Sequence, residues 1–198
     1  MSEKADNLQN KLDTFSYMIG RFIDWEEEIR KEKEEKNFLR KEILEGFSQT
    51  RLMKLLYFTC LASFEDKEDK EDIGLFSIFN NFEAYPKGPV EVDVYSNRSG
   101  LPGFEYNGFY LKEKTDNEAV KISIKESVEN SIKNAITFLK QRKDSFNMLD
   151  TDFLVELSHK LPLWSMAYFS TSNQLNIKNI EYLSIERKRF NDLVKVGN

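Results

Sequence analysis

The sequence contains few of the side chains that build metal sites, disulfide frameworks and catalytic triads. Its 198 residues include one cysteine and one histidine. These counts exclude disulfide scaffolds, zinc sites of the Cys/His type and metal sites that need two histidines. We therefore expect no metal, no cofactor and no catalytic residue.

Long hydrophobic runs and an excess of positive charge are also missing. The longest nearly apolar run, residues 55–64, is much shorter than the ~20 residues of a membrane-spanning helix. The polar start, residues 1–6, lacks the apolar segment of a signal peptide. A net charge of -5 disfavours nucleic acid and anionic membranes as partners. We expect a cytoplasmic protein in which Cys60 is a free thiol.

Glycine and proline are scarce, at 8 and 4 residues, and 40% of the chain is hydrophobic. Such a composition is typical of an ordinary globular protein. At this length, folding buries roughly 70% of the surface of the unfolded chain, which is enough for a core without disulfides. With no internal repeat and no composition shift, we expect one domain over residues 1–198. Its predicted class is mainly α with one small antiparallel β-hairpin, or α+β if the hairpin extends.

The N-terminal half is helical by its hydrophobic period. A charged run at 26–36 carries Glu and Lys or Arg at four-residue spacing, and we favour a solvent-exposed helix face or a helix–helix connection over a docking surface. A second helix covers 39–64, or begins afresh after Ser48-Gln49-Thr50, where either hydroxyl can cap it. Residues 51–64 are apolar almost all round, which indicates a central helix. The apolar stripe of the first helix is formed by Leu8, Leu12, Phe15, Ile19, Phe22 and Ile29.

Three helices are predicted to close the chain. The first carries an apolar stripe from Val128 to Leu139, the second spans 151–160 and ends before Pro162, and the third spans 177–196. Between the two halves, residues 109–113 and 120–124 flank a polar turn. They predict the one hairpin, within residues 104–124.

A proline-containing turn lies in the aromatic segment before this hairpin. Gly88 and Pro89 are followed by Glu91 and Asp93, an order typical of a helix start because Pro suits the first helical position and acids oppose the helix dipole. Gly also permits a tight approach or a positive φ at such a turn. We therefore expect a helix to begin at this turn.

Four segments, in order and spacing, resemble the Panacea antitoxin-domain family, whose members include the SocA-like and GepA-like proteins. The resemblance covers about residues 50–165. It leaves an N-terminal helical extension at 8–47 and a C-terminal helix at 174–198. The segments are Leu52–Phe58, Phe79–Tyr85, Gly88–Val90 with Tyr95, and Leu154–Trp164, which ends in a histidine and a tryptophan.

The chain departs from the family pattern at several positions. Met53 stands where the family often has glutamine, Tyr85 where it usually has tryptophan, and Lys87 where it usually has tyrosine. The charged stretch at 26–47 looks like an insertion or extension. These changes leave the expected core intact but alter any surface shared with a partner.

The resemblance implies a binding protein rather than an enzyme. Members of the family are antitoxins that neutralise varied toxins by protein–protein contact, and they occur near phage and mobile-element genes. For this chain, the resemblance implies a cognate toxin encoded by an adjacent gene. Binding would either occlude the toxin or present it, as an adaptor does, to another cellular machine.

The Gly88-Pro89-Val90 turn and the closing segment supply the candidate partner-binding residues. The turn either defines the fold or presents an aromatic anchor, since Tyr and Trp carry much of the binding energy at interfaces. The same alternative applies to Phe76, Phe79 and Phe82, for which we favour the core. The candidate residues are Phe82, Tyr85, Pro89, Tyr95, His159 and Trp164.

Two other functions stay open on the residues alone. His159 is the only side chain with an ordinary pKa near neutrality, so a small-molecule enzyme could use it together with carboxylates. A Cys60–His159 pair is conceivable, but the apolar neighbours of Cys60 are typical of an inert thiol. The third alternative is a DNA-associated mobile-element protein, against which the acidic charge argues.

Overall fold

Helices dominate the described part of the chain. The computed structural model describes residues 3–33, 38–65, 72–115, 122–142, 146 and 150–195. These residues form eight α-helices and two two-stranded antiparallel sheets, which confirms the predicted mainly α class. The elements are α1 (Glu3–Glu32), α2 (Arg40–Glu45), α3 (Gln49–Ser63), β1 (Phe82–Tyr85), β2 (Gly88–Glu91), α4 (Val92–Ser96), β3 (Phe104–Asn107), β4 (Tyr110–Glu113), α5 (Glu126–Lys140), α6 (Thr151–His159), α7 (Pro162–Tyr168) and α8 (Ile180–Leu193), with 3-10 turns η1 (Gly74–Ser77) and η2 (Arg98–Gly100).

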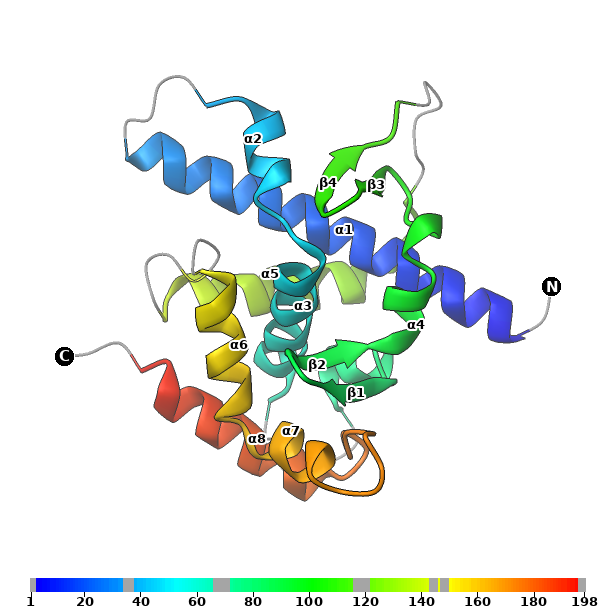
Figure 1. Ribbon diagram of the computed structural model, residues 1–198, viewed down its shortest axis with the longest axis vertical. Helices are drawn as coiled ribbons and strands as arrows, with labels where there is room; N and C mark the ends of the chain where they lie inside the picture. The colour runs from blue at the N-terminus through cyan, green and yellow to red at the C-terminus, as the bar shows by residue number, and fades with distance from the viewer. Residues whose placement is uncertain are drawn as a thin grey trace.

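Helix α3 lies at the centre of the molecule (Figure 1). All of its residues from Arg51 to Ala62 are buried, and it contacts α1, α5, α6, α8 and strand β2. A helix that is apolar on all sides is stable only when other elements cover each side. The predicted central helix is therefore confirmed.

The chain turns sharply between α2 and α3. The Ser48 hydroxyl caps α3 by accepting a hydrogen bond from the Arg51 backbone N–H at 3.2 Å. This cap satisfies one of the N–H groups that a helix start leaves free. Of the two alternatives for residues 39–64, the helix that begins afresh is confirmed, and its cap is Ser48 rather than Thr50.

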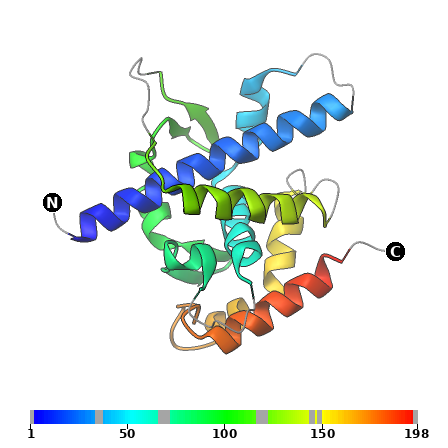
Figure 2. The ribbon, with the colours of Figure 1, turned by 180° about the vertical axis from the view of Figure 1, so that it is seen from behind.

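Helix α1 is a long helix that lies across one side of the molecule, with α5 beside it (Figure 2). Its predicted stripe is buried from Leu12 to Ile29 in the same hydrophobic cluster as α3, and Leu8 is partly buried against that cluster. The charged run at its end is less exposed than expected, because Glu26 is buried and its carboxylate contacts Arg51 at 3.4 Å. The extension at 8–47 therefore shares its core with the rest of the chain.

The predicted hairpin exists, but with a different partner strand. Residues 110–113 form β4, as expected, yet they pair with β3 in the register Asn107↔Tyr110. Residues 122–124 are not a strand, and 116–121 lie outside the described residues. The reason is local: Gly108, at φ 63°, permits a two-residue turn that closes the hairpin before residue 115.

A second hairpin, β1–β2, occupies the place where a helix start was expected. Strands β1 and β2 pair with Tyr85 opposite Gly88. The helix, α4, begins only at Val92, where the Glu91 carboxylate accepts a hydrogen bond from the Val94 N–H at 2.8 Å. The acids therefore do mark a helix start, but it lies after the strand. Gly88 has φ 91°, which excludes it from a right-handed helix.

The C-terminal region contains one helix more than expected. Pro162 ends the α6 segment and is also the first residue of α7, a position where its missing N–H costs nothing. The last helix begins at Ile180 rather than at 174 or 177. Residues 173–175 instead pair with β1: the Ala84 N–H donates to the Asn173 carbonyl at 2.7 Å, and the Leu175 N–H donates to the Phe82 carbonyl at 2.9 Å.

Candidate functional site

The four segments that carry the family resemblance lie against one another around the β1–β2 hairpin. Lys54, on α3, donates a hydrogen bond to the Pro89 carbonyl of β2 at 2.5 Å. Trp164, on α7, donates from its indole Nε1 to the Tyr85 carbonyl of β1 at 3.0 Å. Residues far apart in the sequence therefore meet at one short hairpin, which we take as the candidate site.

Lys54 is the most unusual side chain of the site, because it is an amine with no exposed surface. Burial lowers the pKa of its amine from 10.5 to about 7, since a buried ammonium loses its hydration. The hairpin fits closely around it. A Cβ added to Gly88 would lie 2.2 Å from the Ser158 hydroxyl and 2.9 Å from Cε of Lys54. Glycine at this turn is therefore required by both space and φ.

His159 lies on the other side of the same turn, at the end of α6. Its ring stacks on Trp164 with 3.8 Å between the ring centroids. The pKa of the imidazole is lowered, first by burial and second by the charge of Lys54. A hydrogen bond with the Pro86 carbonyl raises this pKa, but its effect is smaller. Its Nε2 atom is buried without a hydrogen-bond partner among the described residues. The imidazole is therefore held neutral near pH 7.

The structure brings all six candidate partner-binding residues to the hairpin, but in different states of exposure. Phe82 and Pro89 are buried, so their side chains offer no surface to a partner. Burial of Phe82, together with Phe76 and Phe79, confirms the core interpretation of that series. The partly exposed members are Tyr85, Tyr95 and His159, and Trp164 retains a small exposed edge.

An open pocket of about 320 Å³ lies between the start of α3 and the hairpin. The two tyrosines Tyr85 and Tyr95, whose ring centroids are 6.3 Å apart, form part of its wall. No carboxylate belongs to its lining. We call it the Lys54 pocket. Its lining residues are Gln49, Thr50, Met53, Lys54, Tyr85, Pro86, Lys87, Val90 and Tyr95.

Aromatic rings continue from His159 to the surface along α7. Trp164 stacks on Tyr168 at 4.7 Å, and Tyr168 meets Phe169 edge to face at 5.3 Å. We call His159, Trp164, Tyr168 and Phe169 the aromatic stack. Its outer member, Phe169, is 81% exposed, which is unusual for a large apolar ring on a polar chain.

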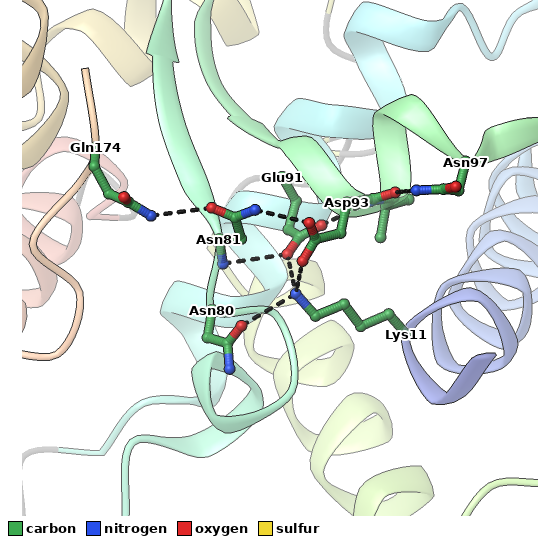
Figure 3. A network of polar contacts seen from close by, with 8 residues as sticks. Lys11, Asn80, Asn81, Glu91, Asp93, Asn97 and Gln174 are labelled. Carbon is green, nitrogen blue, oxygen red and sulfur yellow. Dashed lines mark hydrogen bonds and ion pairs between the residues drawn. The ribbon is translucent and has the colours of Figure 1, made fainter. Parts of the chain in front are cut away.

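A second buried lysine ties α1 to the far end of the same hairpin (Figure 3). The Lys11 amine contacts the Glu91 carboxylate at 2.6 Å and the Asp93 carboxylate at 2.5 Å. It also donates to the Asn80 side chain at 3.1 Å. Three acceptors therefore surround this cation, and the cluster forms a structural joint between α1, β2 and α4.

Another buried carboxylate secures α7. Glu186, on α8, accepts a hydrogen bond from the Leu163 backbone N–H at 2.8 Å and one from the Tyr57 hydroxyl at 2.5 Å. Burial raises the pKa of Glu186 to about 7. Because Leu163 stands in the first turn of α7, the carboxylate caps that helix. The aromatic stack is thereby held on a fixed helix.

The other chemistries considered from the sequence find little support in the geometry. Burial raises the pKa of the Cys60 thiol well above its usual range, so the reactive thiolate is disfavoured. No contact joins Cys60 to His159 in the described ranges. Those ranges also contain no group of three or more His, Cys, Asp or Glu side chains placed to hold a metal ion.

Two residues of the site were missed by sequence reasoning. Lys11 and Lys54 were not singled out, because lysine is almost always exposed. A signal was present for Lys54: it stands between Met53 and Leu55 in a helix that is apolar on every side. A cation at such a position must be buried with the helix. For Lys11, no local pattern indicated burial.

Comparisons of the chain with protein-family models, curated proteins and solved structures find no match. Among the described helices, none is both long and apolar enough to cross a membrane.

Proposed function

We propose that this protein is an antitoxin-like binding protein that neutralises a cognate toxin, encoded by an adjacent gene, through direct contact. The observation that carries the proposal is the aromatic stack, whose exposed end, Phe169, lies at the end of α7, the helix that contacts the hairpin where the four family-like segments converge. The resemblance over about residues 50–165 supplies the class of partner. Binding either occludes the toxin or presents it to another cellular machine, and both modes need the same contact.

The stack has the properties of a binding anchor. Its inner ring, Trp164, is fixed by the bond to the Tyr85 carbonyl, so little side-chain freedom is lost on binding. Its outer ring, Phe169, is exposed, and Met166 on the same helix is also exposed. Large exposed apolar side chains on a preformed surface are typical of interaction sites.

Co-expression with the product of the adjacent gene tests the proposal. The expected result is that the neighbour alone arrests growth and that this protein restores it, with the two proteins co-purifying. If no neighbouring gene product is toxic, or if toxicity persists beside this protein, the antitoxin function is wrong.

A matched pair of variants locates the contact. Phe169→Ser and Phe109→Ser each remove a phenylalanine that is more than four-fifths exposed, at 81% and 83%. Phe169 belongs to the aromatic stack, whereas Phe109 lies at the turn between β3 and β4. We expect Phe169→Ser to abolish rescue and Phe109→Ser to leave it unchanged. If both variants rescue growth, the aromatic stack is not the surface that binds the toxin.

A further inference from the structure

The Lys54 pocket combines positive groups with apolar walls, and its lining includes no acid. Lys54 and Lys87 are the two lysines of the lining. The apolar part comes from Met53, Val90 and the rings of Tyr85 and Tyr95. Such a lining matches a ligand with one negative charge and an apolar body.

Lys54 lacks the compensation that other buried cations receive. Lys11 contacts two carboxylates, and Arg51 contacts the Glu26 carboxylate at 3.4 Å. Lys54 donates to one backbone carbonyl, that of Pro89, although an ammonium has three N–H donors. In the described part of the chain no carboxylate lies against it. A buried cation without a counter-ion is costly, and an anionic ligand would remove that cost.

The start of α3 supplies further donors to the same pocket. Gln49 and Thr50 belong to its lining and are the first two residues of this 15-residue helix. Their backbone N–H groups have no acceptor among the described residues. Free N–H groups at a helix start carry partial positive charge and bind anions. Three sources of positive potential, two lysines and a helix start, therefore belong to the lining of one cavity, and one of them, Lys54, is buried in its wall with no exposed surface.

We propose that the Lys54 pocket is a binding site for a monocarboxylate with an aromatic or aliphatic body. The carboxylate lies toward the start of α3 and Lys54, and the apolar body lies between the tyrosine rings. A pocket of about 320 Å³ accommodates a ligand the size of one amino-acid side chain with its carboxylate. The ligand is either a free organic acid or the C-terminal residue of a bound polypeptide. The inference does not depend on the antitoxin function.

Titration with benzoate and with its neutral isostere benzamide tests the charge requirement on the unaltered protein. Amide chemical shifts in NMR spectra report where each compound binds. We expect benzoate to shift the resonances of Gln49, Thr50 and Val90 and to bind at least about tenfold more tightly than benzamide. Affinities equal within about twofold, or no shift of these resonances up to about 50 mM benzoate, would overturn the proposal.

Lysine variants test whether Lys54 supplies the positive charge that binds the carboxylate. Lys54→Met should weaken benzoate binding by about tenfold or more, because the straight apolar chain keeps the volume and removes the cation. Lys112→Met is the matched control, since Lys112 is an exposed lysine outside the pocket, and it should leave binding unchanged. Should Lys54→Met fail to fold, the benzoate and benzamide titrations still decide the matter. Unchanged benzoate affinity in a folded Lys54→Met protein would also contradict the proposal.

A pair of peptides distinguishes the two sources of carboxylate. N-acetyl-alanyl-phenylalanine is compared with the same dipeptide as its C-terminal amide. Tighter binding of the free-acid dipeptide than of benzoate, lost in the amide, identifies a polypeptide C-terminus as the ligand. Tighter binding of benzoate identifies a free organic acid. If the Lys54→Met protein still rescues growth in co-expression, the Lys54 pocket is not needed for the proposed contact with the toxin.

Discussion

Two buried lysines contact the same short strand, β2, but their charges are compensated differently. Lys11 contacts the carboxylate of Glu91 at 2.6 Å, whereas among the described residues Lys54 donates a hydrogen bond only to the carbonyl of Pro89. Both side chains are almost fully buried, at 1% and 0% exposure. The difference lies in the counter-ion and not in the depth of burial.

This difference separates a structural cation from one that remains available. A cation with matched acceptors fixes the elements that supply them, and removing it leaves buried carboxylates without a partner. A cation without a counter-ion destabilises its own charged form, lowers its pKa and leaves donors for a ligand. Strand β2 therefore has the structural Lys11 cluster at one end, at Glu91, and the candidate binding site of Lys54 at the other, at Pro89.

The largest expected effect comes from Lys11→Met. This substitution leaves Glu91 and Asp93 without their cation, and we expect the free energy of unfolding to fall by about 3–5 kcal/mol. Urea unfolding at pH 7 measures it. Lys31→Met, which removes an exposed ion pair of α1, is the control and should change stability by less than about 0.5 kcal/mol. A loss below about 1 kcal/mol for Lys11→Met would contradict the structural role.

Gly88→Ala is expected to follow in size, with a loss of about 3 kcal/mol. The new Cβ would stand 2.2 Å from the Ser158 hydroxyl, at a backbone φ of 91°. Gly20→Ala is the control, because nothing lies within 4 Å of a Cβ at that helical position. It should stabilise the protein by roughly 0.5–1 kcal/mol. Equal stability of the two variants would show that the turn adapts without strain.

Lys54→Met should change stability in the direction opposite to Lys11→Met. At pH 7 the Lys54 amine of the folded protein is only partly protonated, since its pKa falls to about 7, whereas the same amine in the unfolded chain is protonated. Methionine removes that cost but leaves the Pro89 carbonyl without a donor. We expect a net gain of about 1–2 kcal/mol in the free energy of unfolding. Destabilisation as large as that of Lys11→Met would show that Lys54 is structural too.

The last expected effect is a dependence of stability on pH that is due to Lys54. Its pKa is lower in the folded protein than in the unfolded chain, so between pH 7 and 9 the unfolded chain binds more protons. Stability therefore rises with pH in this window, by up to ~1.4 kcal/mol per unit. Urea unfolding at several pH values measures the slope. It should vanish in Lys54→Met and persist in Lys11→Met; persistence in both would assign it to another group.

The helices could be predicted from the sequence because their signals are local. The stripe of α1 and the all-round apolar surface of α3 are periodic patterns of neighbouring residues. The Ser48 cap also acts within a few residues of itself. The two hairpins were harder to predict from the sequence. Gly108 and Phe109 close β3–β4 earlier in the chain than the polar stretch at 115–118 predicted. Hairpin β1–β2 was not predicted, because Pro89 followed by two acids is a pattern typical of a helix start.

The candidate site could be predicted only in part, because its key contacts join distant residues. Tyr85, Pro89, His159 and Trp164 were identified from the family-like segments, and the structure gathers them at one hairpin. The role of Lys54 depends on Pro89, which is far along the chain, and that of Glu186 depends on Tyr57. No short pattern records such pairs.

The sequence by itself determined the helical class, the central helix and the scarcity of reactive side chains, because composition and period act over short distances. Tertiary structure alone decided which charges are compensated. Whether a buried lysine meets a carboxylate or a lone carbonyl depends on elements packed together from distant parts of the chain. The cost of burying a charge depends on that environment and not on the residue type. For this reason Lys11 and Lys54, alike in the sequence, have different roles in the fold.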